Sequence, residues 1–309
     1  MRVENIRVLF FGTPLFASKI LESLCTFGYN VCGVITQPTK KSGRGALPKP
    51  SLVMETASKY SLLVYQPFSN DELFNIVQQI KPDIIVVAAY GRLIPGDVLA
   101  IPPYGSLNVH GSLLPKYRGS SPIPAAILNG DKETGITIMR MEEGLDAGPI
   151  VSKVKVRLDF TETTTTLYNK LADVGASEII QVIPPYIAGK INIVPQNENK
   201  ATYCTIIKKE DGLINWHRSA LDIERQIRAF TPWPNAYTQW NGKLLKILEG
   251  QVVKKVLEPG NVVALDKSLL IGCGQDSLDV SRLQIEAKKE MSVIDFINGY
   301  KIIDEVNLS

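Results

Sequence analysis

Cysteine and histidine are scarce in this sequence, and their scarcity limits the chemistry that the chain can perform. The 309 residues include four cysteines, none of them in a C-x-x-C pair, and only two histidines. Four scattered thiols do not make a disulfide framework, and two histidines exclude a multi-histidine metal site. We therefore expect a reducing, cytoplasmic setting and no bound metal.

Long apolar runs and a large net charge are also missing. The longest apolar run is Ile84–Tyr90, whereas a membrane-spanning helix needs about 20 residues. The first residues lack the apolar core of a signal peptide, so we expect neither a membrane protein nor an exported one. The formal net charge is +3, a value that by itself favours no class of partner.

The common nucleotide and hydrolase motifs are absent as well. The first predicted strand-to-helix turn reads Gly12-Thr13-Pro14-Leu15 instead of G-x-G-x-x-G, which argues against a nicotinamide or flavin cofactor. The sequence contains no Walker A, G-x-S-x-G or H-E-x-x-H pattern. The chemistry must therefore come from a different set of side chains.

Short apolar runs alternate with helical stripes in the first half of the chain. This alternation predicts an α/β fold with a Rossmann-like, mainly parallel sheet. The predicted strands are Arg7–Gly12, Val31–Thr36, Leu62–Tyr65, Asp83–Ala89, Ser106–His110, Gly135–Met141 and Pro149–Val156. The predicted helices are Leu15–Phe27, Asp71–Lys81, Pro122–Asn129 and Thr165–Val182.

The pattern changes after a polar stretch, Ile193–Lys200, which we interpret as part of a linker. One helix, Ala220–Phe230, is followed only by short strands, which predicts a small OB-like β-barrel domain. These strands are Ala236–Trp240, Leu244–Glu249, Val252–Val256, Asn261–Leu265, Ser268–Ile271 and Ser277–Leu283. We thus expect one domain over residues 1–190, a linker over 191–206 and a second domain over 207–309.

One of the two histidines, His110, occupies a position that suits a catalytic role. His110 and Asn108 lie two residues apart on a predicted strand, so their side chains project from the same face. Gly111 follows, where the strand ends, and ligands of open α/β sheets bind at the carboxyl ends of strands. An amide and an imidazole side by side there could donate hydrogen bonds to one developing oxyanion. A structural histidine with satisfied hydrogen bonds is an equally good interpretation of the spacing alone.

A carboxylate that could complete the site is Asp146. It lies in a loop between Gly144 and Gly148, where the backbone can turn sharply and direct a short side chain inward. Such a carboxylate could orient His110 or set its protonation.

Four stretches of the sequence resemble the folate-dependent formyltransferases. They are Phe11–Ala17 (FGTPLFA), Asn108–Gly119 (NVHGSLLPKYRG), Leu145–Gly148 (LDAG) and, in the second half, Pro232–Tyr237 (PWPNAY). The resemblance implies a Rossmann-like domain that holds the formyl donor and an OB-like domain that contacts tRNA. It also implies transfer of the formyl group of 10-formyltetrahydrofolate to the α-amine of methionine on initiator tRNA, for translation initiation.

The resemblance further implies roles for individual residues, carried over motif by motif. The catalytic positions fall to Asn108, His110 and Asp146. The folate contacts fall to two stretches, namely Ser112, Leu113, Leu114 and Pro115 and the strand-end loop of Tyr90, Gly91, Arg92 and Leu93. The loop Gln37–Pro50, which has basic residues and no acid, corresponds to the family's tRNA-gripping loop and supplies Lys40, Lys41, Arg44 and Lys49. We expect the chain to act as a monomer.

Three other functions remain open on the sequence alone. A folate formyltransferase that acts on a sugar nucleotide or a purine precursor would share the catalytic set but would not need the basic loop. A formyltetrahydrofolate hydrolase would use water as the acceptor. An RNA-binding protein with a silent transferase site would not need Asn108, His110 and Asp146 intact.

Overall fold

The computed structural model describes residues 3–38, 50–265, 267–300 and 308. Its contacts divide the chain into two compact units. The first unit consists of Met1–Pro122, Glu133–Arg157 and Tyr168–Thr205, and the second of Ile123–Lys132, Leu158–Leu167 and Ile206–Ser309. The basic residues expected to grip tRNA, Lys40, Lys41, Arg44 and Lys49, lie outside the described residues.

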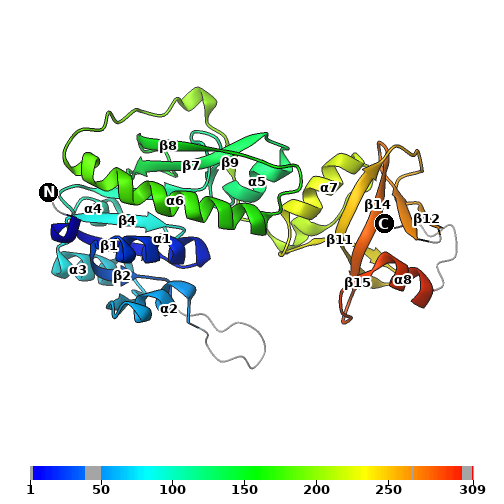
Figure 1. Ribbon diagram of the computed structural model, residues 1–309, viewed down its shortest axis with the longest axis horizontal. Helices are drawn as coiled ribbons and strands as arrows, with labels where there is room; N and C mark the ends of the chain where they lie inside the picture. The colour runs from blue at the N-terminus through cyan, green and yellow to red at the C-terminus, as the bar shows by residue number, and fades with distance from the viewer. Residues whose placement is uncertain (1–2, 39–49, 266, 301–307, 309) are drawn as a thin grey trace. The chain divides into compact units, whose positions relative to one another are not determined.

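A seven-stranded sheet forms the centre of the first unit, in the order β3-β2-β1-β4-β5-β7-β8 (Figure 1). The first five strands in this order pair in parallel. Strand β7 pairs antiparallel with β5, and β8 pairs antiparallel with β7. The strands are β1 (Arg7–Gly12), β2 (Asn30–Ile35), β3 (Val64–Tyr65), β4 (Ile84–Ala88), β5 (Ser106–His110), β7 (Glu133–Arg140) and β8 (Ile150–Arg157). The mainly parallel order confirms the predicted Rossmann-like class.

Helices cover both faces of this sheet because its strands are apolar on both sides. Leu9 and Phe11 of β1 pack in one cluster with side chains of α3 and α4. On the opposite face, α1 and α6 lie side by side in front of the sheet (Figure 1). A Cβ added to Gly175 of α6 would lie 2.9 Å from Val109 and 3.7 Å from Ile20 of α1. These helices are α1 (Leu15–Thr26), α3 (Asn70–Ile80), α4 (Gly96–Leu99) and α6 (Thr164–Ile187).

The ends of the helices follow from local chemistry. Ser69 caps α3 by accepting a hydrogen bond from the Glu72 amide, and Lys81 ends the helix with φ 49°. Helix α6 continues to Ile187 through Pro184 and Pro185, past the predicted end at Val182. Each proline removes one N–H···O=C hydrogen bond to the residue four positions before it. The Ile180 carbonyl, which loses its donor at Pro184, accepts a hydrogen bond from the Tyr29 hydroxyl at 2.8 Å instead.

The second unit contains an antiparallel sheet in the order β10-β11-β14-β13-β12, with β15 paired to β14. Its strands are β10 (Ala236–Trp240), β11 (Lys243–Val253), β12 (Val262–Leu265), β13 (Ser268–Gly272), β14 (Ser277–Ile285) and β15 (Met291–Ser292). Side chains of the sheet, of α7 (Ala220–Ala229) and of α8 (Val293–Gly299) share one apolar core. This small antiparallel unit is consistent with the predicted OB-like class.

Strand β11 differs from the sequence-based prediction of two strands, Leu244–Glu249 and Val252–Val256. The chain passes through Gly250 without a turn, because two register shifts against β14, on either side of Glu249, absorb the irregularity as a bulge. Several short elements were not predicted. They are α2 (Leu52–Lys59), α4, α8, β6 (Arg118–Gly119), β9 (Tyr203–Cys204), β15 and the 3₁₀ turns Val3–Asn5, Glu198–Lys200 and Lys209–Gly212. Helix α5 (Pro122–Leu128) agrees with its prediction.

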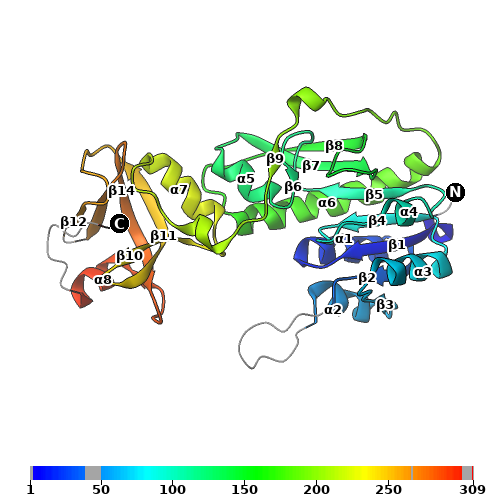
Figure 2. The same ribbon diagram turned by 180° about the vertical axis from the view of Figure 1, so that it is seen from behind.

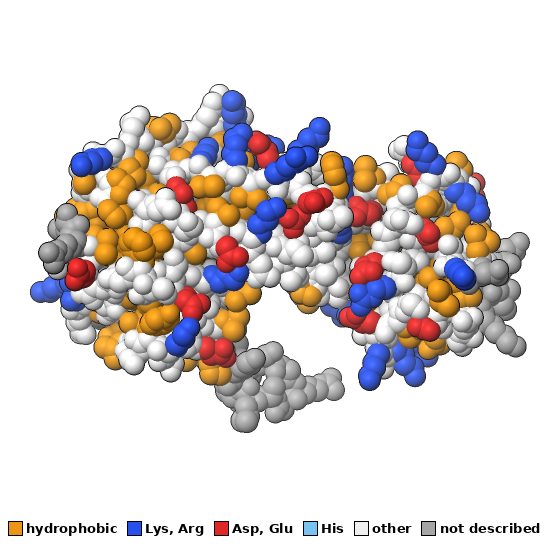
Figure 3. Space-filling model, in the orientation of Figure 1, with side chains coloured by type: hydrophobic (Ala, Val, Ile, Leu, Met, Phe, Trp, Pro, Cys, Tyr) orange, Lys and Arg blue, Asp and Glu red, His pale blue; other side chains and the backbone are white. Residues whose placement is uncertain are grey.

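The surface carries both signs of charge. On the face drawn in Figure 3, Lys and Arg side chains are interspersed with Asp and Glu side chains. This mixture agrees with the formal net charge of +3. Among the helices of the described residues, none is long and apolar enough to cross a membrane.

Candidate active site

The carboxyl ends of the parallel strands β4 and β5 meet at one edge of the sheet. Val87 of β4 pairs with Asn108 of β5, and His110, the last residue of β5, pairs with Thr137 of the antiparallel strand β7. Figure 2 shows β5 between β4 and β7. Since strand ends of open α/β sheets form ligand sites, this edge is where a site is expected.

Asn108 and His110 project together from β5, as their spacing predicts. Their side chains are 8% and 6% exposed, whereas Val109 between them faces α6 on the other side of the sheet. Both polar groups are therefore buried at the edge of the core, and each needs hydrogen-bond partners there.

Asp146 brings its carboxylate to the same place. Its Oδ1 accepts a hydrogen bond from Asn108 Nδ2 at 3.4 Å, and its Oδ2 lies 3.7 Å from His110 Nδ1. The backbone N–H of Gly119 donates to Oδ2 at 2.8 Å. The structure thus brings together the amide, the imidazole and the carboxylate that the sequence analysis selected.

The other ring nitrogen of His110, Nε2, already has a hydrogen-bond partner. Nε2 lies 2.9 Å from the carbonyl oxygen of Tyr117. A carbonyl oxygen only accepts, so Nε2 carries a proton and donates it to this bond. Nδ1, on the Asp146 side, is then the nitrogen that remains for a substrate, and it can donate only when the ring is the doubly protonated imidazolium.

The predicted folate stretch from Ser112 to Pro115 forms a turn that is tied to β7. Ser112 Oγ donates to Lys116 O at 2.6 Å, Thr137 Oγ1 donates to Ser112 O at 2.7 Å, and the Leu114 amide donates to Thr137 Oγ1 at 3.1 Å. Ser112 and Leu114 are buried, while Leu113 and Pro115 are partly exposed. The turn therefore follows directly from His110 and presents Leu113 and Pro115 at its surface.

The predicted folate loop from Tyr90 to Leu93 follows β4. Tyr90 is buried against Phe11, with ring centroids 5.3 Å apart, and burial raises the pKa of its phenol. Arg92 Nη1 donates to Pro67 O at 2.6 Å, whereas Leu93 is 79% exposed. The loop thus offers an apolar side chain and the backbone of Gly91 to a ligand at the strand ends.

Several groups around the site were not given roles by the sequence analysis. They are the Tyr117 carbonyl, the Gly119 amide, the Arg118 guanidinium and the Gln196 side chain, whose Nε2 donates to Asp146 O at 2.7 Å. The first three belong to the motif that carries the resemblance, which was a usable signal. Gln196 lies in the polar stretch interpreted as a linker, where nothing in the sequence distinguishes it from a solvated side chain.

The sheet and the side chains at its strand ends are those of an α/β enzyme. The chain belongs to the formyl transferase family, because residues 4–183 match the family model described as Formyl transferase and residues 206–301 match the one described as Formyl transferase, C-terminal domain.

Proteins named methionyl-tRNA formyltransferase are similar to this chain over almost its whole length. The one from Dictyoglomus thermophilum is 42% identical over 306 residues, which cover 96% of this chain and 98% of that protein. The one from Dehalococcoides mccartyi strain CBDB1 is 41% identical over 314 residues and covers 99% of each chain.

Solved structures of two further proteins share the fold. The sugar 3N-formyl transferase WlaRD, determined in the presence of dTDP and 5-N-formyl-THF, has a TM-score of 0.67 at 19% identity and covers 92% of this chain and 99% of its own. HypX from Aquifex aeolicus, in complex with tetrahydrofolic acid, has a TM-score of 0.66 at 16% identity. This chain spans about half the length of HypX, with 98% of this chain and 50% of that chain covered. At these identities the similarity shows the fold alone.

Proposed function

We propose that this chain transfers the formyl group of 10-formyltetrahydrofolate to the α-amino group of methionine on initiator tRNA, in translation initiation. One observation carries the proposal: in a chain about 41–42% identical to methionyl-tRNA formyltransferases over nearly its full length, the Asp146 carboxylate lies 3.4 Å from Asn108 Nδ2 and 3.7 Å from His110 Nδ1. The amino group attacks the formyl carbon directly, so the reaction needs no serine or cysteine nucleophile.

The developing oxyanion is the charge that the site must stabilise. Attack on the formyl carbon turns its carbonyl oxygen into an oxyanion, to which Asn108 Nδ2 and the protonated Nδ1 of His110 donate. Each such donor typically contributes about 10²–10³ in turnover. Because Nε2 is held by Tyr117 O, the imidazole ring has a fixed orientation before the substrate binds.

Asp146 balances the charge of His110 and helps to remove a proton from the attacking amine. The amine loses one proton as the new C–N bond forms, and N10 of the folate gains one as its bond to the formyl carbon breaks. A positioned acid or base contributes about 10²–10⁴ to such a step. The Gly119 amide keeps the Asp146 carboxylate close to both side chains of β5.

The residues at the strand ends suit a folate. The exposed Leu93 and the partly exposed Leu113 and Pro115 offer apolar contacts to a flat ring system. Gly91 has φ 77° and no side chain, so a ligand can approach its backbone closely. We propose that Tyr90, Gly91, Arg92, Leu93, Ser112, Leu113, Leu114 and Pro115 form this site, the buried ones by supporting its shape.

The tRNA contacts complete the proposal. We assign formyl transfer to residues 1–190 and tRNA contact to residues 207–309. Residues 191–206 are the linker between these two domains. Lys40, Lys41, Arg44 and Lys49 bind phosphates near the acceptor end, which makes affinity for tRNA fall with salt. The enzyme works as a monomer in the cytoplasm.

The deciding experiment is transfer of labelled formyl from 10-formyltetrahydrofolate to methionine-charged initiator tRNA, with the uncharged tRNA as control. We expect label only on the charged tRNA. Release of tetrahydrofolate without transfer would indicate a hydrolase. Label that appears on an aminosugar nucleotide or on an amine precursor of purines, and not on the charged tRNA, would indicate one of the other formyltransferases.

A further inference from the structure

Arg118 is a buried arginine that the reaction described above does not use. Its side chain is 1% exposed, although it belongs to the two-residue strand β6, which pairs with β9. A buried guanidinium needs partners for its donors. Nη1 and Nη2 donate to the two carboxylate oxygens of Glu198 at 2.8 and 2.7 Å, and Nε and Nη2 donate to Gln196 Oε1 at 3.1 and 2.9 Å.

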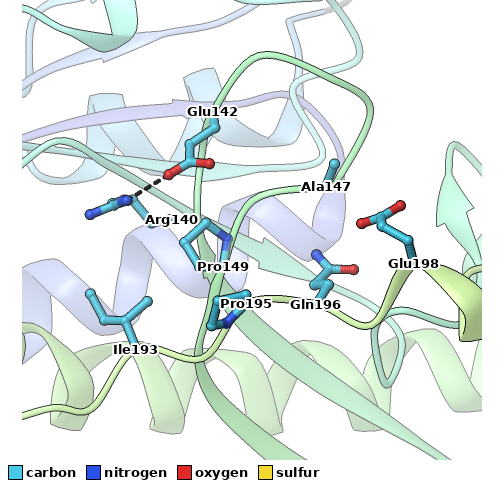
Figure 4. A pocket seen from close by; sticks show the side chains of 8 residues that line it. All are labelled: Arg140, Glu142, Ala147, Pro149, Ile193, Pro195, Gln196 and Glu198. Atoms are coloured by element: carbon cyan, nitrogen blue, oxygen red, sulfur yellow. Dashed lines mark hydrogen bonds and ion pairs between the residues drawn. The ribbon is translucent and has the colours of Figure 1, made fainter.

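Gln196 connects this guanidinium to the loop that carries Asp146. Its amide oxygen accepts from Arg118, and its Nε2 donates to the carbonyl oxygens of Asp146 and Gly148, both at 2.7 Å. Figure 4 shows Gln196 below the segment that carries Ala147, with Glu198 beside it. Both ends of the amide are therefore used, and its donors hold the backbone of the loop at Asp146 and two residues beyond.

The backbone of Asp146 needs this support. Its φ is 50°, in the left-handed region that residues other than glycine rarely adopt. The Gly119 N–H holds the carboxylate of Asp146, and Gln196 holds its carbonyl. Arg118 and Gly119 are neighbours, so one short strand fixes Asp146 twice, once directly and once through Gln196.

We propose that Arg118 and Gln196 are positioning residues, which hold the Asp146 carboxylate toward Asn108 and His110 without touching the substrate. The inference rests on the proposed function, and on the catalytic role proposed there for Asp146. Rates of positioned reactions are sensitive to small displacements, and about 1 Å can lower a rate by about 10²-fold. A loop freed from Gln196 would lose rate in this way while both substrates still bind.

The test variant is Gln196→Glu, which keeps the size of the side chain and an acceptor for Arg118. It removes the two N–H donors and places a carboxylate oxygen against the carbonyls of Asp146 and Gly148. We expect kcat to fall about 10–100-fold, while KM for each substrate changes by less than about threefold. The matched control is Gln181→Glu, the same chemical change at an exposed position of α6, where Gln181 Nε2 donates to Ser177 Oγ at 3.4 Å. We expect the control to keep wild-type kcat.

A double-mutant cycle separates positioning from general stabilisation of the fold. If Gln196 acts through the Asp146 carboxylate, Gln196→Glu has little further effect on the residual single-turnover rate of the Asp146→Asn variant. An equal fold loss in both backgrounds would assign Gln196 a structural role only and overturn the proposal. An unchanged kcat in Gln196→Glu, or a change confined to KM, would overturn it as well.

Thermal unfolding of every variant accompanies the kinetics. If Gln196→Glu does not fold, Gln196→Met takes its place in the same cycle, because it keeps most of the volume and leaves Arg118 its contact with Glu198. If the wild type formylates methionyl-tRNA and the Gln196 variant is equally active, only the positioning role is refuted. A wild-type chain that does not formylate it refutes the proposed function, and with it the role of Asp146.

Discussion

Asn108 and His110 lie on a strand and Asp146 lies on a loop, and the two regions hold their side chains in different ways. Strand β5 is paired on both sides, by β4 and β7, and alternation along it places the two side chains on one face. The Asp146 loop depends on contacts from distant parts of the chain, the Gly119 amide and the Gln196 side chain. Substitutions on the strand should therefore change the chemistry alone, whereas those around the loop should also change geometry and stability.

We call Asn108 and His110 the strand half of the site, and Asp146 with the groups that hold it the loop half. The largest expected effect is that of Asp146→Ala, which removes the carboxylate from the loop half. We expect kcat to fall about 10²–10⁴-fold, because a positioned acid or base is lost. The measurement is single-turnover formyl transfer to charged initiator tRNA. Asp173→Ala is the control, since Asp173 is 68% exposed in an ion pair with Lys19 and should keep wild-type turnover. Wild-type turnover in Asp146→Ala would refute the assigned role.

The strand half of the site is tested by Asn108→Ala. Loss of one oxyanion donor should lower kcat about 10²–10³-fold, with the melting temperature nearly unchanged because β5 keeps its backbone pairing. Asn108→Asp keeps the size of the side chain but not the donor, and it should be at least as slow. The readouts are steady-state kinetics and thermal unfolding of both variants. Full activity in either variant would show that the oxyanion is stabilised elsewhere.

Gly119→Ala tests the loop half through the backbone. Gly119 has φ 114°, and an added Cβ would lie 2.2 Å from the carbonyl oxygen of Cys204 in β9. We expect a loss of about 1–3 kcal/mol in the free energy of unfolding, measured in urea, together with a lower kcat because the Gly119 N–H holds Asp146.

The control for this substitution is Gly189→Ala. Gly189 also has a positive φ, 67°, but nothing lies within 4 Å of an added Cβ, so only the conformational strain of alanine is introduced. Equal destabilisation by the two substitutions would mean that the close approach of β6 and β9 does not matter.

The same contrast explains how much the sequence could predict. The strand half depends on local pattern, because alternation from Leu107 to His110 and the glycine after it already place Asn108 and His110 on one face at a strand end. The strands of the seven-stranded sheet were predicted close to their observed bounds for the same reason, since burial on both faces produces continuous apolar runs such as that of β4. The helices were predicted less well, because α2 was missed and α6 extends beyond its predicted end.

The loop half depends on contacts between residues far apart in the sequence. Gln196 lies 50 residues from Asp146, and Glu198 lies 80 residues from Arg118. A polar stretch that contains a proline has the same composition whether its side chains face water or a buried guanidinium. The sequence could therefore select Asp146 by its neighbouring glycines, but it could not show which side chains hold it.

The smallest expected effect concerns pH and the contact between Arg118 and Glu198. The hydrogen bonds from Arg118 hold the pKa of the Glu198 carboxyl below its usual value of 4.5. A carboxyl with a lowered folded-state pKa stabilises the fold above its unfolded-state pKa, and this stabilisation is lost as pH falls through the lowered value. Because the Glu198 side chain is 66% exposed, solvent screens the pair and the effect is small.

Thermal unfolding of the wild type and of Glu198→Gln, from about pH 7 to about pH 3, measures this effect. We expect the wild type to have the higher melting temperature at neutral pH and the difference to shrink in acid. Glu133→Gln serves as the control, since Glu133 pairs with the exposed Lys155 outside the Asp146 loop. Parallel melting curves for the wild type and Glu198→Gln would mean that the charge of Glu198 does not stabilise the fold, and that Gln196 and the Tyr203 hydroxyl suffice to hold Arg118. If the curves converge in acid for Glu198→Gln and not for Glu133→Gln, the fold is stabilised by a charge beside the Asp146 loop that acid removes.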